Sequence, residues 1–131
     1  MILIDTNLII RFITKDPAEH YEKAKDFFEK IAKREIKALI SESVLMECYF
    51  VLHKLYKIDK QIVIKKLKTL LEFQNIVNED KYILIEALNI LNDTNIDFVD
   101  CLLCAKSRLL DYDIVSFDKD IKKCSKKIIE L

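Results

Sequence analysis

The chain has 131 residues, of which 51% are hydrophobic and 34% are charged, so we predict a single domain over residues 1–131. Its 22 basic and 22 acidic residues cancel, which excludes a strongly basic nucleic-acid scaffold and leaves only local basic patches open. Glycine is absent, which excludes the glycine-rich loops of Walker A and dinucleotide-binding sites and leaves turns to Asn, Asp and Lys.

Short apolar runs alternate with longer amphipathic segments along the chain. In the first half, we predict a buried strand over residues 1–4, helices over 7–14 and 18–33, a strand over 36–40, a helix from a Ser41 or Ser43 cap to Leu55, and a helix over 60–73. In the second half, we predict a strand over 75–78, helices over 79–92 and 98–110, and strands over 113–117 and 128–129. This alternation predicts an α/β sandwich around a mostly parallel sheet.

The chain shows neither a membrane span nor a signal peptide. Charged residues interrupt every apolar run well before about 18 residues, the length that a membrane helix needs. Residues 1–5 lack a basic region followed by a long apolar core. We therefore expect a cytoplasmic protein with no membrane association.

Four cysteines, at positions 48, 101, 104 and 124, require an interpretation. Cys101 and Cys104 form a C-x-x-C, a spacing used in redox centres and in half of a zinc site. No second such pair completes a zinc site, and both residues fall inside a predicted helix. We therefore interpret the cysteines as small buried apolar residues.

The predicted helix that contains residues 44–52 is apolar on nearly every side, which is typical of a buried helix. Glu47 is the exception. A carboxylate inside such a helix would be costly to bury without a partner, so Glu47 is a candidate functional residue.

Four acidic residues are expected to meet at one rim of the sheet. Asp5 and Asp118 each follow a predicted strand, and ligand sites in open α/β sheets lie beyond the carboxyl ends of the strands. Glu47 and Asp100 lie near helix starts, which face the same rim. Four carboxylates in one cleft repel each other unless cations lie between them, so one or two Mg²⁺ or Mn²⁺ ions are expected. Such ions catalyse phosphodiester hydrolysis.

Structural roles remain open for each of these acids. Asp5 could cap the following helix, and Asp97 fits a cap better than a metal ligand. Asp100 could complement a helix dipole, and Asp118 could be a turn residue. His20 and His53 belong to no nucleophilic constellation, so they are expected to be uninvolved.

Four segments together resemble the motifs of a known family. Residues 4–7 (Ile-Asp-Thr-Asn), 43–47, 97–105 and 116–120 are similar, in order and spacing, to the four motifs of PIN domains, particularly the VapC-type toxins of toxin–antitoxin pairs. The resemblance covers essentially the whole chain. It implies a PIN-like three-layer sandwich, with a mostly parallel central sheet of four or five short strands and about six or seven helices.

The resemblance also implies roles for individual residues. Asp5, Glu47, Asp100 and Asp118 would be both the catalytic and the metal-binding acids, with Asp97 as an auxiliary acid. The side chains that would orient these carboxylates are those of Thr6, Asn7 and Ser116. The implied activity is Mg²⁺- or Mn²⁺-dependent endonucleolytic hydrolysis of RNA, by a homodimer that an antitoxin protein neutralises.

Two lysine-rich stretches are candidate RNA-binding surfaces, because lysines contact phosphates without reading sequence. The stretch over residues 54–68 fits a solvated helix face equally well. The stretch over residues 119–127 follows Asp118 directly, so it is the better candidate, with phosphate contacts expected at Lys119, Lys122 and Lys123.

Two other functions remain open beside the toxin. The chain could be a PIN nuclease of RNA processing that has no antitoxin, in which case no small DNA-binding gene would lie upstream. It could also be a non-catalytic PIN-like module that binds RNA or protein, although the presence of all four acids disfavours this reading.

Overall fold

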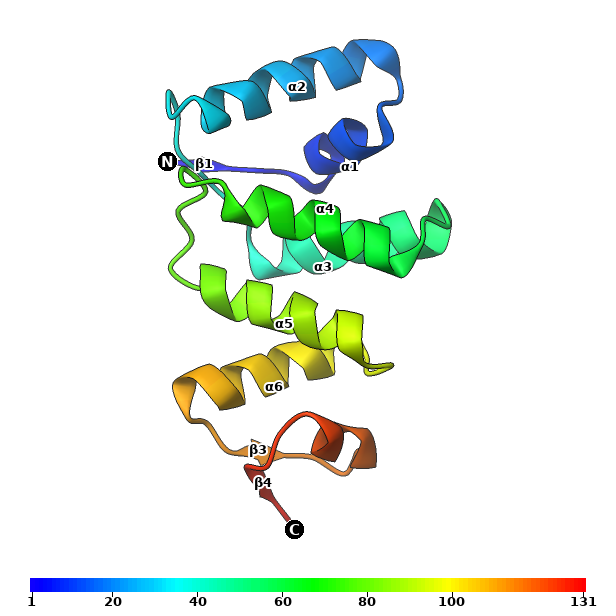
Figure 1. The fold of residues 1–131 in the computed structure, drawn as a ribbon, viewed down its shortest axis with the longest axis vertical. Coiled ribbons are helices and arrows are strands. Elements are labelled where there is room, and N and C mark those ends of the chain that lie inside the picture. Colours follow the sequence, from blue (N-terminus) through cyan, green and yellow to red (C-terminus); the bar gives the residue numbers. More distant parts are fainter. The chain divides into compact units, whose positions relative to one another are not determined.

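A computed structural model describes all 131 residues, which form two compact units, Met1–Glu79 and Asp80–Leu131. The first unit contains β1 (Ile2–Leu3), α1 (Thr6–Thr14), α2 (Ala18–Ala32), β2 (Ala38–Leu39), α3 (Glu42–Phe50), η1 (Val51–Leu55) and α4 (Lys60–Glu72) (Figure 1). The second unit contains α5 (Lys81–Asp93), α6 (Phe98–Leu110), β3 (Ile114–Val115), η2 (Lys119–Lys123) and β4 (Ile128–Ile129). None of the helices is long and apolar enough to cross a membrane.

The sheet of the first unit is short and parallel. β1 pairs with β2 in the register Ile2 to Ala38, and the Ile4 amide extends the pairing by donating to the Leu39 carbonyl at 3.0 Å. The strand at the amino terminus was predicted to be buried, but Leu3 is 72% exposed and burial begins only at Ile4. The burial prediction was therefore wrong for the strand itself. β1 delivers the chain to Asp5 at the start of α1, which packs against α2 (Figure 1).

The strand predicted over residues 75–78 is reduced to one parallel bridge between Ala38 and Ile76. On both sides of this bridge, asparagine side chains form hydrogen bonds with the backbone groups of the neighbouring strand. Asn75 Nδ2 donates to the Ile36 carbonyl at 2.9 Å, and the Asn78 amide bonds to both the N–H and the carbonyl of Ile40. Asparagines compete well for backbone groups, so they end the ladder after a single bridge.

The helix predicted from a Ser41 or Ser43 cap to Leu55 has Ser41 as its cap, begins at Glu42 and changes type at its end. Ser41 caps it by accepting the Val44 amide at 3.3 Å, and residues 51–55 widen into the π-helical segment η1. Only one side of this helix is buried, along Leu45, Cys48 and Leu52. Glu47 is exposed, so the prediction of a helix buried all round was wrong.

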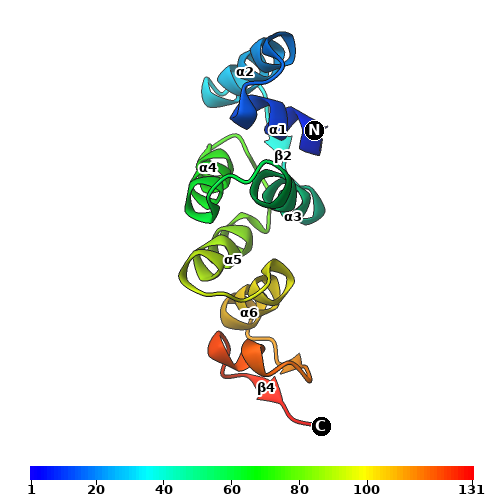
Figure 2. The same ribbon diagram turned by 90° about the vertical axis from the view of Figure 1, so that its right-hand side faces the viewer.

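The second unit is built on a helical hairpin, because α5 and α6 lie side by side in both ribbon views (Figures 1 and 2). β3 follows α6 and pairs in parallel with β4, in the register Ile114 to Ile128. η2 lies between these two strands and was not predicted. Its central residue, Ile121, is fully buried and anchors the short helix to the unit.

The α/β class and the parallel pairing of strands are confirmed, and the six α-helices agree with the predicted six or seven. The continuous sheet of four or five strands is not seen, because each unit contains a sheet of only two strands. Each strand is just two residues long, so polar neighbours and turns end the ladders early.

Turns that usually rely on glycine use other residues here. Lys15 ends α1 at φ 61° and Asp111 ends α6 at φ 61°, both in the left-handed conformation. Arg34 and Lys57 also have positive φ. Non-glycine residues pay a steric cost in this region, so these positions are sites where glycine would be tolerated.

Candidate active site

Asp5 follows β1 directly and is the N-cap residue of α1. Its Oδ1 accepts the Thr6 amide at 2.9 Å, while the side chain as a whole stays exposed. The capping role considered from the sequence is therefore present. A cap uses only one carboxylate oxygen, and no other hydrogen bond of Asp5 is found, so the second oxygen is available to a ligand.

Glu47 and Asp5 both act on one buried thiol. The pKa of Cys48 is raised to about 12, first by burial and then by the negative charges of Glu47 and Asp5. The Cys48 thiol donates weakly to the Thr6 carbonyl at 3.9 Å, which places α3 against the start of α1. Both acids of the first unit therefore contribute to one region of negative potential.

A shallow cavity of about 290 Å³ in the first unit includes Asp5 among its lining residues. Asn7, Arg11, His20 and Lys23 line it as well. Arg11 and Lys23 were not predicted to belong to a site and His20 was expected to be uninvolved, because each has the sequence surroundings of an ordinary surface residue. Their contact with the Asp5 cavity depends on the packing of α2 on α1, which local patterns do not predict.

The acids of the second unit gather around Asp100, which lies in the first turn of α6 and is half-buried. Its pKa is raised first by burial, then by the charge of Asp118, with further contributions from Asp97 and Asp120 and from a side-chain hydrogen bond with Asp118. Asp97 occupies the N-cap position of α6 without a side-chain capping bond. The four aspartates thus form one carboxylate cluster.

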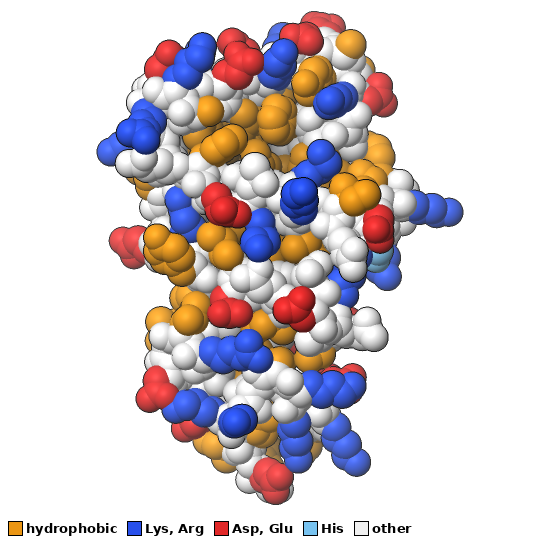
Figure 3. All heavy atoms as spheres, viewed as in Figure 1, with side chains coloured by type: hydrophobic (Ala, Val, Ile, Leu, Met, Phe, Trp, Pro, Cys, Tyr) orange, Lys and Arg blue, Asp and Glu red, His pale blue; other side chains and the backbone are white.

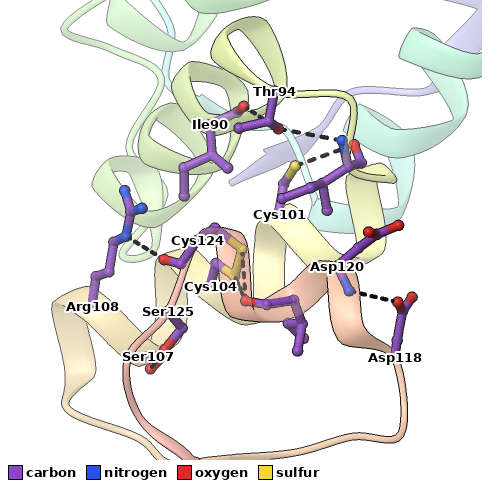
Figure 4. Close-up of a disulfide and its surroundings, with 12 residues drawn as sticks. Ile90, Thr94, Cys101, Cys104, Ser107, Arg108, Asp118, Asp120, Cys124 and Ser125 are labelled. Carbon is purple, nitrogen blue, oxygen red and sulfur yellow. Dashed lines mark hydrogen bonds between the residues drawn. A yellow bond between two sulfur atoms is a disulfide. The ribbon is translucent and has the colours of Figure 1, made fainter.

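Asp118 is held in a tight turn between β3 and η2. Its amide donates to Ser116 Oγ at 2.9 Å. Its Oδ1 accepts the Asp120 amide at 2.9 Å (Figure 4). Ser116 thus fixes the backbone of Asp118 rather than its carboxylate. Asp118 and Asp120 are both exposed, so the turn presents the carboxylates to solvent.

A disulfide joins Cys104 on α6 to Cys124 at the end of η2, with the Cα atoms 5.8 Å apart (Figure 4). Next to it, Ser107 and Ser125 share a buried hydrogen bond of 2.8 Å, and Arg108 Nε donates to the Cys124 carbonyl at 2.8 Å. All four cysteines are buried, as predicted, but the bond itself was not predicted. The C-x-x-C had directed attention to Cys101, which is a free thiol.

The predicted RNA-contacting lysines lie on η2. Lys122 pairs with Glu130 at 3.1 Å, Lys123 pairs with Asp120 at 3.0 Å, and Lys119 is exposed. A cavity of about 330 Å³ behind this helix is lined by Ser107, Arg108 and residues 122–127. The space-filling view shows basic and acidic side chains interspersed, with no large surface of one sign (Figure 3). Exposed pairs of this kind are weak, so phosphate groups could displace the acidic partners.

The structure contains no group of three or more His, Cys, Asp or Glu side chains in an arrangement that could hold a metal ion. The available donors are nevertheless chemically suited to one ion type. Carboxylate oxygens are ligands for Mg²⁺ and Mn²⁺, and no histidine lies among the candidate acids. The pKa of Asp100 is raised by burial and then by the neighbouring carboxylates, whose mutual repulsion a divalent cation would offset. Asp100 and Asp118 therefore fit a hard divalent cation.

The α/β architecture with aspartates at strand and helix termini defines the class of the protein. The PIN domain family model matches residues 2–127, so the chain belongs to the PIN domain family. The chain is also 26% identical to a VapC ribonuclease of Aquifex aeolicus (strain VF5), over 130 residues that cover 98% of this chain and 96% of the relative.

Proposed function

We propose that the protein is a divalent-metal-dependent endoribonuclease that acts as the toxin of a toxin–antitoxin pair. The observation that carries the proposal is the carboxylate cluster around Asp100, whose pKa is raised first by burial and then by the neighbouring negative charges. A cluster of this kind is costly unless it binds a cation. Membership of the PIN domain family and the similarity to a VapC ribonuclease support the same reading.

Asp5, Glu47, Asp100 and Asp118 are the proposed catalytic and metal-binding residues. Bound Mg²⁺ or Mn²⁺, as one or two ions, would activate water and stabilise the negative charge that develops on the phosphate during hydrolysis. The free oxygen of Asp5 and the exposed carboxylate of Glu47 are available as ligands from the first unit. Asp97 is the proposed auxiliary acid.

The protein groups around these acids restrict their motion. The Thr6 amide holds one oxygen of Asp5, and the Ser116 hydroxyl holds the turn that carries Asp118. A carboxylate that is already oriented loses less entropy when it binds a cation. Asn7 lines the cavity beside Asp5, where its amide can bond to a ligand carboxylate or to the substrate.

The RNA backbone is proposed to lie along the basic groups near these acids. Lys119, Lys122 and Lys123 follow Asp118 on η2, and Arg11 and Lys23 line the cavity beside Asp5. Such groups neutralise phosphates without reading the base sequence, so RNA target choice depends on shape and on the bases near the cleaved bond.

We propose further that residues 1–131 form a single PIN domain with a three-layer architecture. The match of the family model to residues 2–127 supports this extent. In the cytoplasm, the proposed site of action, the toxin would be a homodimer and would be held inactive by an antitoxin protein.

The test is the cleavage of a mixed pool of cellular RNA by the purified chain. We expect cleavage with Mg²⁺ or Mn²⁺ and none with excess EDTA. Internal cuts in RNA that is blocked at both ends identify an endonuclease. Cleavage that persists in EDTA would contradict the metal-dependent mechanism.

Expression in cells separates the toxin from a processing nuclease. A toxin arrests growth when it is produced alone, and a neighbouring small gene of DNA-binding type restores growth. A processing enzyme needs no such gene. A binding module would retain RNA in a mobility-shift assay without cleaving it under any metal condition.

A further inference from the structure

Phe117 is the most exposed large hydrophobic side chain of the chain, at 89%. It lies between two residues already assigned to the site, Ser116 and Asp118. A single exposed apolar residue needs no explanation in itself. An exposed aromatic ring next in sequence to a proposed metal-binding aspartate is a candidate contact for the substrate of that site.

The backbone that carries this ring is fixed. The Ser116 hydroxyl accepts the Asp118 amide at 2.9 Å, so a closed turn spans Phe117. On the amino-terminal side, β3 is paired with β4 up to Val115. On the carboxyl-terminal side, η2 begins with the Asp118 cap. The ring is therefore carried by a hydrogen-bonded, solvent-exposed turn.

The residues that follow supply the charges that a nucleotide needs. Asp118 would bind the metal ion beside the phosphate, and the exposed Lys119 is available for a phosphate oxygen. Proteins that hold single-stranded nucleic acid combine such cations with aromatic rings, on which unpaired bases stack. Aromatic, acid and lysine are consecutive here, so one nucleotide could contact all three.

We propose that Phe117 is a substrate-positioning residue, on which an unpaired base next to the cleaved phosphodiester stacks. This inference rests on the proposed ribonuclease function and adds a residue that positions the substrate. Stacking accepts any base, because every base has a π-face. Bases inside a duplex cannot reach the ring, so paired RNA should be a poor substrate.

Fluorescence tests the stacking directly, because the chain contains no tryptophan. Phe117→Trp introduces the only tryptophan, which can be excited apart from the five tyrosines, and Asp5→Asn in the same chain is included to prevent turnover in Mg²⁺. We expect a short unpaired RNA to quench the emission far more than an abasic RNA of the same length does. Tyr82→Trp, at a 76% exposed position on α5, is the matched control and should not respond. Equal quenching by both RNAs, or none, would overturn the proposal.

Kinetics in the cleaving enzyme give a second readout. Loss of one stacked base is worth about 5- to 100-fold in binding, so Phe117→Ala should raise KM for unpaired RNA by about that factor and change kcat little. Phe117→Tyr keeps the ring and should keep KM. An unchanged KM for Phe117→Ala would overturn the proposal. A variant that differs from the natural chain only in its sedimentation, and so in its oligomeric state, would also overturn it, because the ring would then lie in a protein interface.

The two experiments separate the stacking of a base on Phe117 from the cleavage of RNA. If the natural chain cleaves unpaired RNA but Phe117→Trp is not quenched, stacking is wrong and the nuclease stands. If Phe117→Trp is quenched by RNA but not by abasic RNA, stacking stands even where no cleavage occurs.

Discussion

Cys104 and Cys124 are covalently linked, and each lies close in sequence to one of the candidate acids of the second unit. Cys104 is one helical turn after Asp100 on α6, and Cys124 ends the short helix that Asp118 begins. The bond therefore ties the two elements whose carboxylates interact, as the raised pKa of Asp100 records.

Removal of this disulfide should destabilise the protein. The bond joins residues 20 positions apart in sequence. A disulfide that closes a loop of this size adds about 3 kcal/mol to the free energy of unfolding, because it restricts the unfolded chain. We expect the double variant Cys104→Ser, Cys124→Ser to unfold at a lower denaturant concentration than the natural chain. Excess phosphine reductant should lower the denaturation midpoint of the natural chain to a similar value. The double variant is its own control, since the reductant should leave it unchanged. A natural chain insensitive to reductant would show that the bond does not form in solution.

Neutralising Asp100 should stabilise the metal-free protein. The folded pKa of Asp100 is raised, so the native state holds its proton more tightly than the unfolded chain does. Below the ordinary aspartate pKa of about 3.9, Asp100 is protonated in both the folded and the unfolded state, so it does not lower the free energy of unfolding. As pH rises through the elevated folded pKa, the native state loses stability relative to Asp100→Asn.

We therefore expect Asp100→Asn to melt a few °C above the natural chain in EDTA near neutral pH, with the difference vanishing in acid. Mg²⁺ should reduce the difference, since it compensates the charges. Asp113→Asn, an exposed aspartate of the same unit, is the control and should shift the melting temperature little. A natural chain more stable than Asp100→Asn in EDTA at neutral pH would count against the carboxylate cluster.

Cleavage should depend more on Asp100 than on Asp97. Asp100 is half-buried and interacts with Asp118, whereas Asp97 is exposed at the N-cap position. We expect Asp100→Asn to reduce kcat on the order of 100-fold or more and Asp97→Asn to reduce it less. Initial rates on one labelled RNA measure both. The reverse order would mean that the metal ligand of this pair is Asp97.

Replacement of the η2 lysines should weaken the salt dependence of RNA binding. Each phosphate contact with single-stranded nucleic acid contributes about 0.7 to the slope of log K against log salt concentration. Lys119→Ala, Lys122→Ala and Lys123→Ala together should therefore lower the slope by up to about 2. Lys25→Ala, at an exposed position on α2, is the control and should leave the slope unchanged. A slope unchanged in the triple variant would remove η2 from the RNA path.

Much of the local structure could be predicted from the sequence, because helices and strands depend on nearby residues. The predicted boundaries of α6 are those observed, and the strand at residues 128–129 forms as predicted. The sheet was overestimated because a run such as residues 75–78 has strand-like composition, while its asparagines bond to Ile36 and Ile40 instead of continuing the ladder.

Residue pairs distant in sequence were beyond prediction. Nothing local distinguishes Cys124 from Cys101 as the partner of Cys104, and the choice depends on how η2 folds back onto α6. The apolar flanks of Glu47 suggested burial, yet the helix buries one side only, so the acid stays exposed. The candidate acids could be proposed from the sequence, because strand ends and helix starts are local features, and their role in catalysis stays a prediction.

The most direct test compares Asp5→Asn with Asp118→Asn, one acid from each compact unit, on a single labelled unpaired RNA in Mg²⁺. Both substitutions remove a charge and keep the shape of the side chain, and circular dichroism should show natural folding. We predict that each variant loses cleavage on the order of 100-fold or more. Full cleavage by either variant would contradict the catalytic role proposed for the aspartate that it replaces.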